Sequence, residues 1–278
     1  MPPDHRRRDA GRKRYRSDGS SLWTRRNIDG PGVWVTCLKG KEKQTVGEVY
    51  DLFESLADEL WPTGTKEPTG SADGSSDAES EKEEDLEKAI AKEVQRMKQP
   101  RKQQRFANCS TDTPCIVFIS CKPPIDPVIM VESHMKNIER TGITHTRSTQ
   151  RLVPISNSCD CNIPEIISLC RRIVAPAFSE GNADVNENTD SPKVYRYKIE
   201  LRMRNHNTLS RDDVIKTIAQ CVPAQHKVDL VNAELFILVE IFKATCGMSI
   251  VRDYYCYKKF NVIEVSQARL AENEGMAE

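Results

Sequence analysis

The segment from Lys193 to Phe260 constrains the fold of this chain most, because it begins with alternating apolar and basic side chains. A period of two is the signature of a β-strand with two different faces. One face carries the apolar side chains of Tyr195, Tyr197, Ile199, Leu201 and Met203. The other carries Arg196, Lys198, Arg202 and, just past the strand, Arg204, interrupted by Glu200. We expect the first face to pack on a core and the second to present cations to solvent.

The residues that follow predict a helix and two further strands. Asn205–Asn207 turns the chain, and Ser210 is a favourable N-cap with Asp213 in the place where a capping box usually carries Glu. The helix is expected to stop before Pro223. Apolar strands are predicted over 235–241 and about 248–255, and a basic-aromatic run with Lys258 and Lys259 comes next. The whole segment therefore reads as one folded unit.

The first half of the chain also alternates predicted strands with predicted helices. Strands are expected over 33–38, 115–119 and 151–155, and helices over 45–60, 127–140 and 163–175. Alternation of this kind favours layered α/β or α+β architecture over a helix bundle.

The net charge of zero is an average of opposing blocks. Residues 1–27 hold nine Arg and Lys against three Asp, whereas residues 67–93 hold ten acids against three Lys. We expect a disordered basic tail over 1–30 and a disordered acidic insertion over 62–100, because neither can bury enough apolar area to order itself. From 191 to 260, twelve cations face seven acids. Local charge, not the total, decides where a phosphate chain binds.

Enzymatic chemistry is not indicated. Cys159 and Cys161 form one close cysteine pair, whereas zinc sites usually need a second. The histidines fit no hydrolase arrangement, and His134 is expected at the surface of a helix. We find no glycine-rich phosphate or dinucleotide loop. We therefore predict no catalytic residue, no metal and no cofactor, and we interpret the ten cysteines as reduced intracellular thiols.

The order YKIELRMRN…LSRDDVI…HKVDL…LVEI…YKKFN resembles the C-terminal half of a THUMP domain. The similarity is strong over about residues 191–262, fair over 31–61 and 105–178, and absent elsewhere. It implies an α+β protein with a small ferredoxin-like domain over 31–123, a THUMP RNA-binding domain over 124–263, and a disordered tail over 264–278. The long acidic insertion and the basic tail depart from a minimal THUMP protein.

The resemblance is closest to stand-alone THUMP proteins that serve RNA cytidine acetyltransferase as its tRNA adaptor. It implies a non-catalytic protein that grips the acceptor end of tRNA and presents the tRNA for N4-acetylcytidine formation in the D-arm. Cations with neighbouring aromatic rings suit such a strand of RNA. The predicted RNA-binding residues are Arg196, Lys198, Arg202, Arg204, Asn205, Arg211, Lys227, Lys258 and Lys259, with Arg140, Arg147 and Arg151 as further candidates.

Two other functions stay open. A self-sufficient tRNA-modifying enzyme of another chemistry is disfavoured, because too few residues follow Asn261 for a catalytic domain. A protein–protein interaction module without RNA contact would leave the basic strand as a solvated face. Tyr195, Tyr197 and Phe260 are expected in the core rather than in contact with bases. The basic cluster Arg6–Arg14 is interpreted as a nuclear import signal or a loose RNA contact, with a solvated tail as the alternative, and the expected location is nuclear or nucleolar. No apolar run is long enough for a membrane span.

Overall fold

A computed structural model describes residues 28–62, 104–179 and 194–275. The predicted basic tail, apart from 28–30, and the predicted acidic insertion, apart from residue 62, lie outside these residues. Within the described residues, no helix is long and apolar enough to cross a membrane.

The first unit consists of six elements in the order βαββαβ. They are β1 (Gly32–Cys37), α1 (Glu42–Leu60), β2 (Phe106–Cys109), β3 (Ile116–Cys121), α3 (Pro127–Thr141) and β4 (Thr149–Ile155). The strands form an antiparallel sheet in the order β2-β3-β1-β4. This element order and strand order are those of a ferredoxin-like fold, as predicted.

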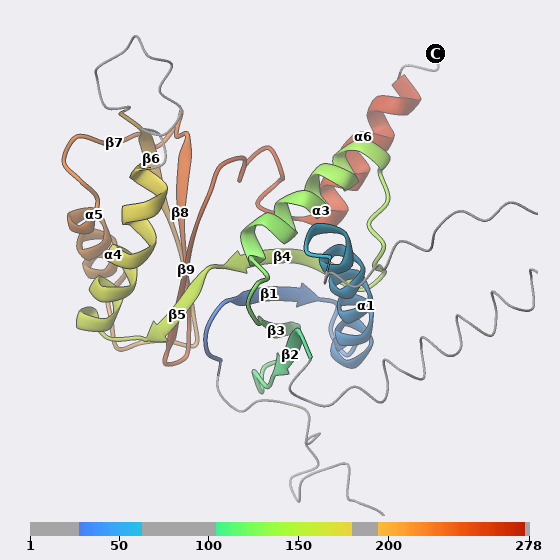
Figure 1. Cartoon of the computed structure of the whole chain (residues 1–278), viewed down its shortest axis with the longest axis horizontal. Helices are drawn as coiled ribbons and strands as arrows, with labels where there is room; N and C mark the ends of the chain where they lie inside the picture. The colour runs from blue at the N-terminus through green and yellow to red at the C-terminus, as the bar shows by residue number, and fades with distance from the viewer. Residues whose placement is uncertain (1–27, 63–103, 180–193, 276–278) are drawn as a thin grey trace, which may run out of the picture.

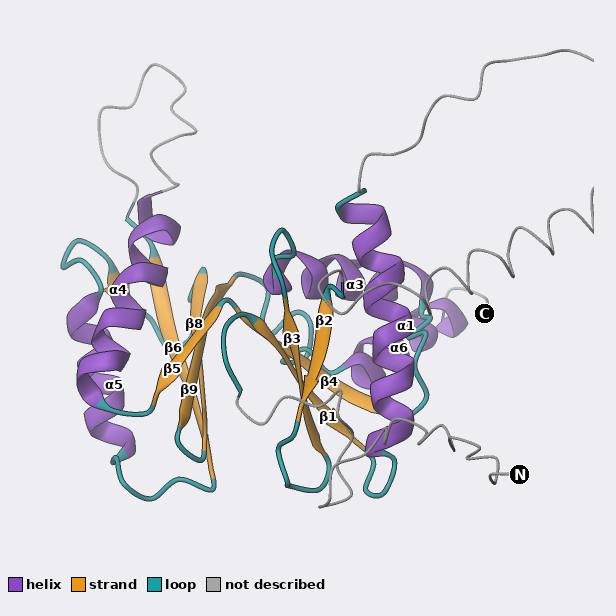
Figure 2. Cartoon of the chain, turned by 60° about the horizontal axis from the view of Figure 1, so that its bottom comes forward, coloured by secondary structure: helices purple, strands orange, loops and turns teal. Residues whose placement is uncertain are grey.

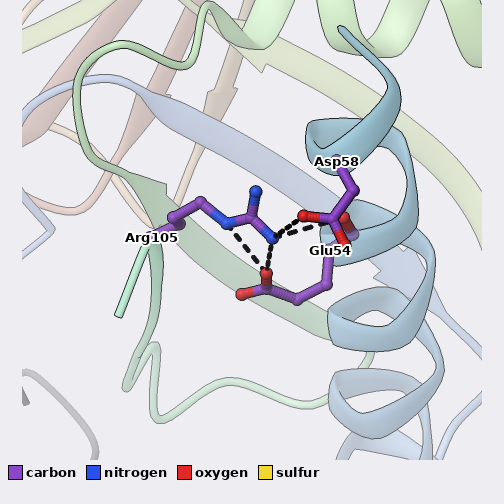
Figure 3. A network of polar contacts seen from close by, with 3 residues as sticks. All are labelled: Glu54, Asp58 and Arg105. Carbon is purple, nitrogen blue, oxygen red and sulfur yellow. Dashed lines mark hydrogen bonds and ion pairs between the residues drawn. The ribbon is translucent and has the colours of Figure 1, made fainter. Parts of the chain in front are cut away.

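Local sequence explains how these elements begin and how they are held together. Asp126 caps α3 by accepting from the backbone N–H of Val128 at 2.7 Å, and α3 ends at Gly142 with a φ of 75°. Arg105, just before β2, donates to the carboxylates of Glu54 and Asp58 on α1 (Figure 3). This ion-paired contact fixes the edge strand to the helix.

The second unit contains α4 (Ile163–Ser179), β6 (Arg196–Arg204), α5 (Arg211–Cys221), β7 (Lys227–Val228), β8 (Leu235–Phe242) and β9 (Thr245–Val251). These strands and β5 (Asn157–Asp160) form a sheet in the order β5-β9-β8-β6-β7. Strand β6 runs parallel to β8, and α5 makes the crossover between them. Ser210 caps α5 as predicted, accepting from the backbone N–H of Asp213 at 3.1 Å.

The two sheets lie side by side between two sets of helices (Figure 2). Helices α4 and α5 pack on one face of the second sheet, whereas α1 and α3 pack on the first, with α6 (Val262–Gly275) against α3. Trp34 of β1 lies where the sheets meet, with its ring centroid 4.8 Å from that of Phe118 and 5.0 Å from that of Phe242 on β8. Of the two hydrophobic cores, the first therefore includes residues of both units, whereas the second lies beneath α4 and α5.

Strands β4 and β5 follow each other almost without interruption and belong to different sheets. Strand β4 pairs with β1, and β5 pairs with β9. Between them Ser156 donates its backbone N–H to the carbonyl of Met248 at 3.0 Å. The chain thus passes from one sheet into the other as extended backbone.

The structure corrects several expectations. The boundary predicted at 123/124 falls inside the first unit, because α3 and β4 complete its helical layer and its sheet. Residues 264–275, predicted as a disordered tail, continue helix α6 because its buried side chains Val262 and Val265 pack on the first core. The strand predicted to end near 255 stops at Val251.

His134 is also placed differently from the prediction. His134 lies on the buried side of α3 and is 1% exposed, whereas we expected it at the surface of a helix. Burial lowers the pKa of His134 to about 4, and neighbouring His145 lowers it as well. The ring is therefore neutral in the folded protein at neutral pH.

This burial predicts an acid-sensitive fold. The folded-state pKa of about 4 lies below the ordinary value of 6.5, so the unfolded chain binds the extra proton first. Stability is present in full above about pH 6.5 and falls as the pH drops toward about 4, by roughly 2–3 kcal/mol. Urea unfolding of the wild type and His134→Gln over this range checks it. Equal losses of stability in both proteins would contradict it.

The contact between the sheets predicts a second effect on stability. A Cβ at Gly247 of β9 would lie 2.9 Å from Cγ2 of Ile155, which is fully buried on β4. We expect Gly247→Ala to destabilise the protein by about 1–3 kcal/mol through overpacking. Gly47→Ala on α1 is the control, because its Cβ meets nothing within 4 Å and Ala stabilises helices by roughly 0.5–1 kcal/mol. Thermal unfolding should separate the two in opposite directions.

Candidate nucleic-acid interface

The candidate interface starts on the face of β6 that turns away from α4 and α5. Tyr197 and Leu201 are buried in the core beneath these helices, and Ile199 and Met203 pack against the same core. The alternate residues, which therefore lie on the opposite face, are Lys198, Glu200, Arg202 and Arg204. The period-two prediction is confirmed for the apolar side of this strand.

Three arginines surround one carboxylate at the C-terminal end of β6. Arg202 lies directly opposite Glu240 of β8, with Nη1 3.7 Å from Oε1. Arg204 on β6 and Arg151 on β4 also interact electrostatically with Glu240. We call Arg151, Arg202 and Arg204 the arginine cluster. It draws its cations from both units.

Burial sets the charge balance of this cluster. The side chain of Glu240 is 10% exposed, and burial raises its pKa to about 6, against the opposing effect of the three arginines. Burial also lowers the pKa of Arg204. The positive charges of Arg202 and Arg151 lower it further, whereas the negative charge of Glu240 raises it. The three arginines repel one another, and two carboxylates compensate their charge. One is the buried Glu240, and the other is Glu264, 3.8 Å from Arg151. The cluster therefore carries excess positive charge.

A second group on the same face joins β6 to the turn after β9. Lys198 Nζ donates to the hydroxyl of Tyr255 at 2.6 Å and lies 2.9 Å from Glu200 Oε1, and the Tyr255 hydroxyl donates to that same oxygen. The hydrogen bonds that Lys198 donates to Tyr255 and Glu200 raise the pKa of Lys198. Burial acts to raise the pKa of Glu200, but Tyr255 and Lys198 outweigh it and the net shift is downward. Both groups are therefore ionised at neutral pH.

Tyr255 also meets the basic-aromatic run. Lys259 Nζ lies 5.5 Å from the centroid of the Tyr255 ring, and Lys198 Nζ lies 4.7 Å from it. Tyr255 is 41% exposed. An exposed ring between cations is a suitable platform for a nucleic-acid base.

The segment 252–260 holds these residues in an unusual conformation. Lys258, Lys259 and Phe260 have φ values of 49°, 59° and 57°, a left-handed region that L-residues avoid. The buried side chains of Tyr254, Tyr257 and Phe260 anchor the turn, and the Phe260 carbonyl accepts from the N–H of Leu152 at 3.1 Å. Packing therefore compensates the backbone strain and fixes where the two lysines emerge.

We define the basic face as the arginine cluster together with Lys198 and Lys259. Of the predicted RNA-binding residues, the structure brings Lys198, Arg202, Arg204 and Lys259 to this face, and Lys258 is exposed in the adjoining turn. Arg151, a further candidate in the sequence, joins them through β4. Their roles in binding stay a prediction.

Other predicted residues lie elsewhere or are already engaged. Arg196, at the start of β6, forms ion pairs with Asp229 at 3.7 Å and Glu234 at 3.8 Å. Lys227 lies on edge strand β7, next to Arg196 in the strand register. Arg211 on α5 donates to the backbone carbonyl of Leu201 at 2.8 Å. Asn205 turns the chain after β6 with a φ of 52°. Each of these four residues therefore has a structural role, through its side chain or its backbone.

Sequence patterns missed the acidic and aromatic members of the site. Glu240 sits in a run of apolar residues, and this is itself a usable signal, because a lone carboxylate in a buried strand requires cationic partners. Tyr255 was not predicted as a member of the site, because it falls in a segment predicted as strand. Its pairing with Lys198 depends on the turn and could not be found from spacing.

The cysteines do not assemble a metal centre in the described part of the chain. Cys159 of β5 lies opposite Cys246 of β9, and the two thiols interact. Across residues 28–62, 104–179 and 194–275, no group of three or more Cys, His, Asp or Glu side chains could hold a metal ion.

Comparison with known proteins identifies the second unit. Residues 161–251, from just before α4 to the end of β9, match the family model described as THUMP domain. An uncharacterized protein of Schizosaccharomyces pombe is 35% identical over 236 residues, which are 84% of this chain and 75% of that protein.

Two further relatives carry informative names. The tRNA acetyltransferase TAN1 of Saccharomyces cerevisiae is 28% identical over 258 residues, 87% of each chain. THUMP domain-containing protein 1 of Mus musculus is 28% identical over 242 residues, 84% of this chain and 64% of that protein. The matched residues include β6 and β8, which carry Arg202, Arg204 and Glu240 of the basic face. The chain belongs to the family of THUMP-domain proteins.

Proposed function

We propose that this chain is a tRNA-binding adaptor in tRNA acetylation. The observation that carries the proposal is the basic face, where cations from β4, β6 and the 252–260 turn converge on the sheet face opposite α4 and α5. The match of residues 161–251 to the THUMP domain supports an RNA ligand. The name of the yeast relative, tRNA acetyltransferase, supports the reaction in which that ligand is used.

The chemistry of the basic face suits a phosphate backbone. Guanidinium groups bind phosphate oxygens in a planar, bidentate geometry, and ammonium groups add charge without a fixed direction. Arg202 and Arg204 lie two residues apart on one strand, so both project from the same face. Tyr255 offers an exposed ring beside Lys198 and Lys259. Phosphate contacts of this kind fix the position of an RNA without reading its sequence.

A non-catalytic role fits this arrangement better than a catalytic one. The basic face consists of cations, their carboxylate partners and a tyrosine hydroxyl that is already hydrogen bonded to Lys198 and Glu200. None of these is a nucleophile paired with a free base. We propose that RNA cytidine acetyltransferase supplies the chemistry and that this chain orients the tRNA, with its acceptor end on the basic face and its D-arm toward the enzyme. A nuclear or nucleolar address is part of the same proposal.

Removing the cluster arginines tests RNA binding. Arg202→Ala with Arg204→Ala should weaken tRNA binding and make the plot of log affinity against log salt shallower by about 0.7–0.9 per lost phosphate contact, because fewer counterions are released. Arg171→Ala with Arg172→Ala on α4 is the matched control, since it removes the same charge from exposed positions of the other layer. A slope equal to that of the wild type would assign the basic face no phosphate contact.

An acetylation assay tests the adaptor role. Purified RNA cytidine acetyltransferase, ATP, acetyl-CoA and tRNA are incubated with and without this chain, and N4-acetylcytidine is measured. We expect product only when both proteins are present, and less of it with a tRNA that lacks its single-stranded acceptor end. Product formed by this chain alone would make it an enzyme. Product formed equally without it would leave the interaction-module hypothesis.

A further inference from the structure

The arginine cluster contains an anion of its own. Glu240 reaches it from the middle of β8, a strand in which every residue is buried. The residue opposite Glu240 on the other side is Gly247 of β9, which brings no charge, so the carboxylate depends on the cations of β6 and β4. Its ion-pair partner is Arg202, and the 3.7 Å between Nη1 and Oε1 is longer than a direct hydrogen bond. A carboxylate held this loosely compensates several cations without saturating any of them.

The arginines have little else to bind. Arg202 is 31% exposed in its side chain and makes its ion pair with Glu240 alone among the described residues. Arg151 has a second carboxylate, Glu264 of α6, at 3.8 Å with the Glu264 side chain 53% exposed. A guanidinium presents five N–H donors, and most of those in the cluster have no protein acceptor within the described chain. The open donors and the excess charge suit one further anion with several oxygens.

We propose that the arginine cluster is a site for one phosphodiester group of RNA, and that Glu240, its resident counterion, takes up a proton when that group binds. The inference rests on the proposed function and adds a specific site and a regulation by pH. A phosphate beside the arginines adds negative charge near a buried carboxylate, and two like charges in one buried site disfavour each other. Protonation of Glu240 removes the repulsion and leaves the arginines to the phosphate.

The surroundings of Glu240 single it out as the group that changes charge. Arg202 and Arg204 face it from β6 and Arg151 faces it from β4, and all three stay charged at neutral pH. Tyr254 of the 252–260 turn lies in the same field, but burial raises the pKa of its hydroxyl to about 12. The remaining nearby acids are Glu200, which is held ionised by Lys198 and Tyr255, and Glu264, which is more exposed. Burial has already raised the pKa of Glu240 to about 6, so a modest additional push protonates it near neutral pH.

The direction of the pH effect follows from linkage. A ligand that favours the protonated form binds more tightly at low pH, and the affinity falls as the pH rises. We expect wild-type affinity for tRNA to be about threefold to tenfold higher near pH 6 than near pH 8, beyond any change seen without Glu240. Glu240→Gln mimics the protonated side chain, so its affinity should exceed that of the wild type near pH 8 and match it more closely near pH 6. A variant that failed to fold would bind more weakly, not more tightly.

The experiment is a calorimetric titration of the full chain with a transcribed tRNA in two buffers of different ionisation enthalpy, which gives the number of protons taken up. The wild type should take up a fraction of a proton per tRNA near pH 6.5, and Glu240→Gln should lose this uptake. Glu200→Gln is the matched control. It removes a carboxylate from the same face, so it strengthens binding equally at both pH values and keeps the proton uptake.

The outcomes separate this inference from the proposed function. Salt-sensitive tRNA binding with no proton uptake, or with the same uptake in Glu240→Gln, overturns the role of Glu240 and leaves the tRNA-binding proposal standing. Absence of tRNA binding by the wild type at any pH overturns both. Uptake that disappears with Glu240→Gln and persists with Glu200→Gln establishes the proton-linked site.

Discussion

The apolar contact between the two sheets determines the rest of this structure. Trp34 of the first sheet packs against Phe242 of the second, and Ile155 lies so close to Gly247 that no side chain fits there. A hydrogen bond from the Ser249 hydroxyl to the Pro154 carbonyl, at 2.7 Å in a buried position, adds a polar contact at the same place. Burial of large apolar side chains is the main stabilising force in such a junction. It holds β4 and β8 in one orientation, and thereby brings Arg151 to Arg202 and Arg204.

The basic face is therefore a product of two folding units and not of one strand. Residues 161–251 alone carry Arg202, Arg204 and Glu240, whereas Arg151 lies on β4 and the paired lysines follow β9. The cations of the sheet differ in how completely neighbouring carboxylates neutralise them. Arg196 is neutralised by Asp229 and Glu234, and Lys198 shares Glu200 with Tyr255, while three arginines share one buried carboxylate. Excess charge is concentrated at the end of β6 that meets the first unit.

The 252–260 turn shows how strain and packing cooperate at this face. Three consecutive non-glycine residues in the left-handed region would unfold the turn if it stood alone. Three buried aromatic rings and a hydrogen bond to β4 hold it, and the same segment then leads into α6, which packs on α3. The turn thus ties the second unit back onto the first, on the side where the lysines are displayed.

Most of the regular structure follows from local patterns in the sequence. Period-two alternation placed the apolar side of β6 correctly, Ser210 marked the start of α5, and the apolar run of β8 indicated a buried strand, because each of these signals depends only on neighbours in the chain. Local patterns did not contain four features that depend on the tertiary structure: α3 and β4 belong to the first unit, His134 is buried, Arg196 is neutralised, and Glu240 lies among arginines from two units. These depend on contacts between residues far apart in sequence, whose energies come from desolvation and charge and cannot be read from spacing.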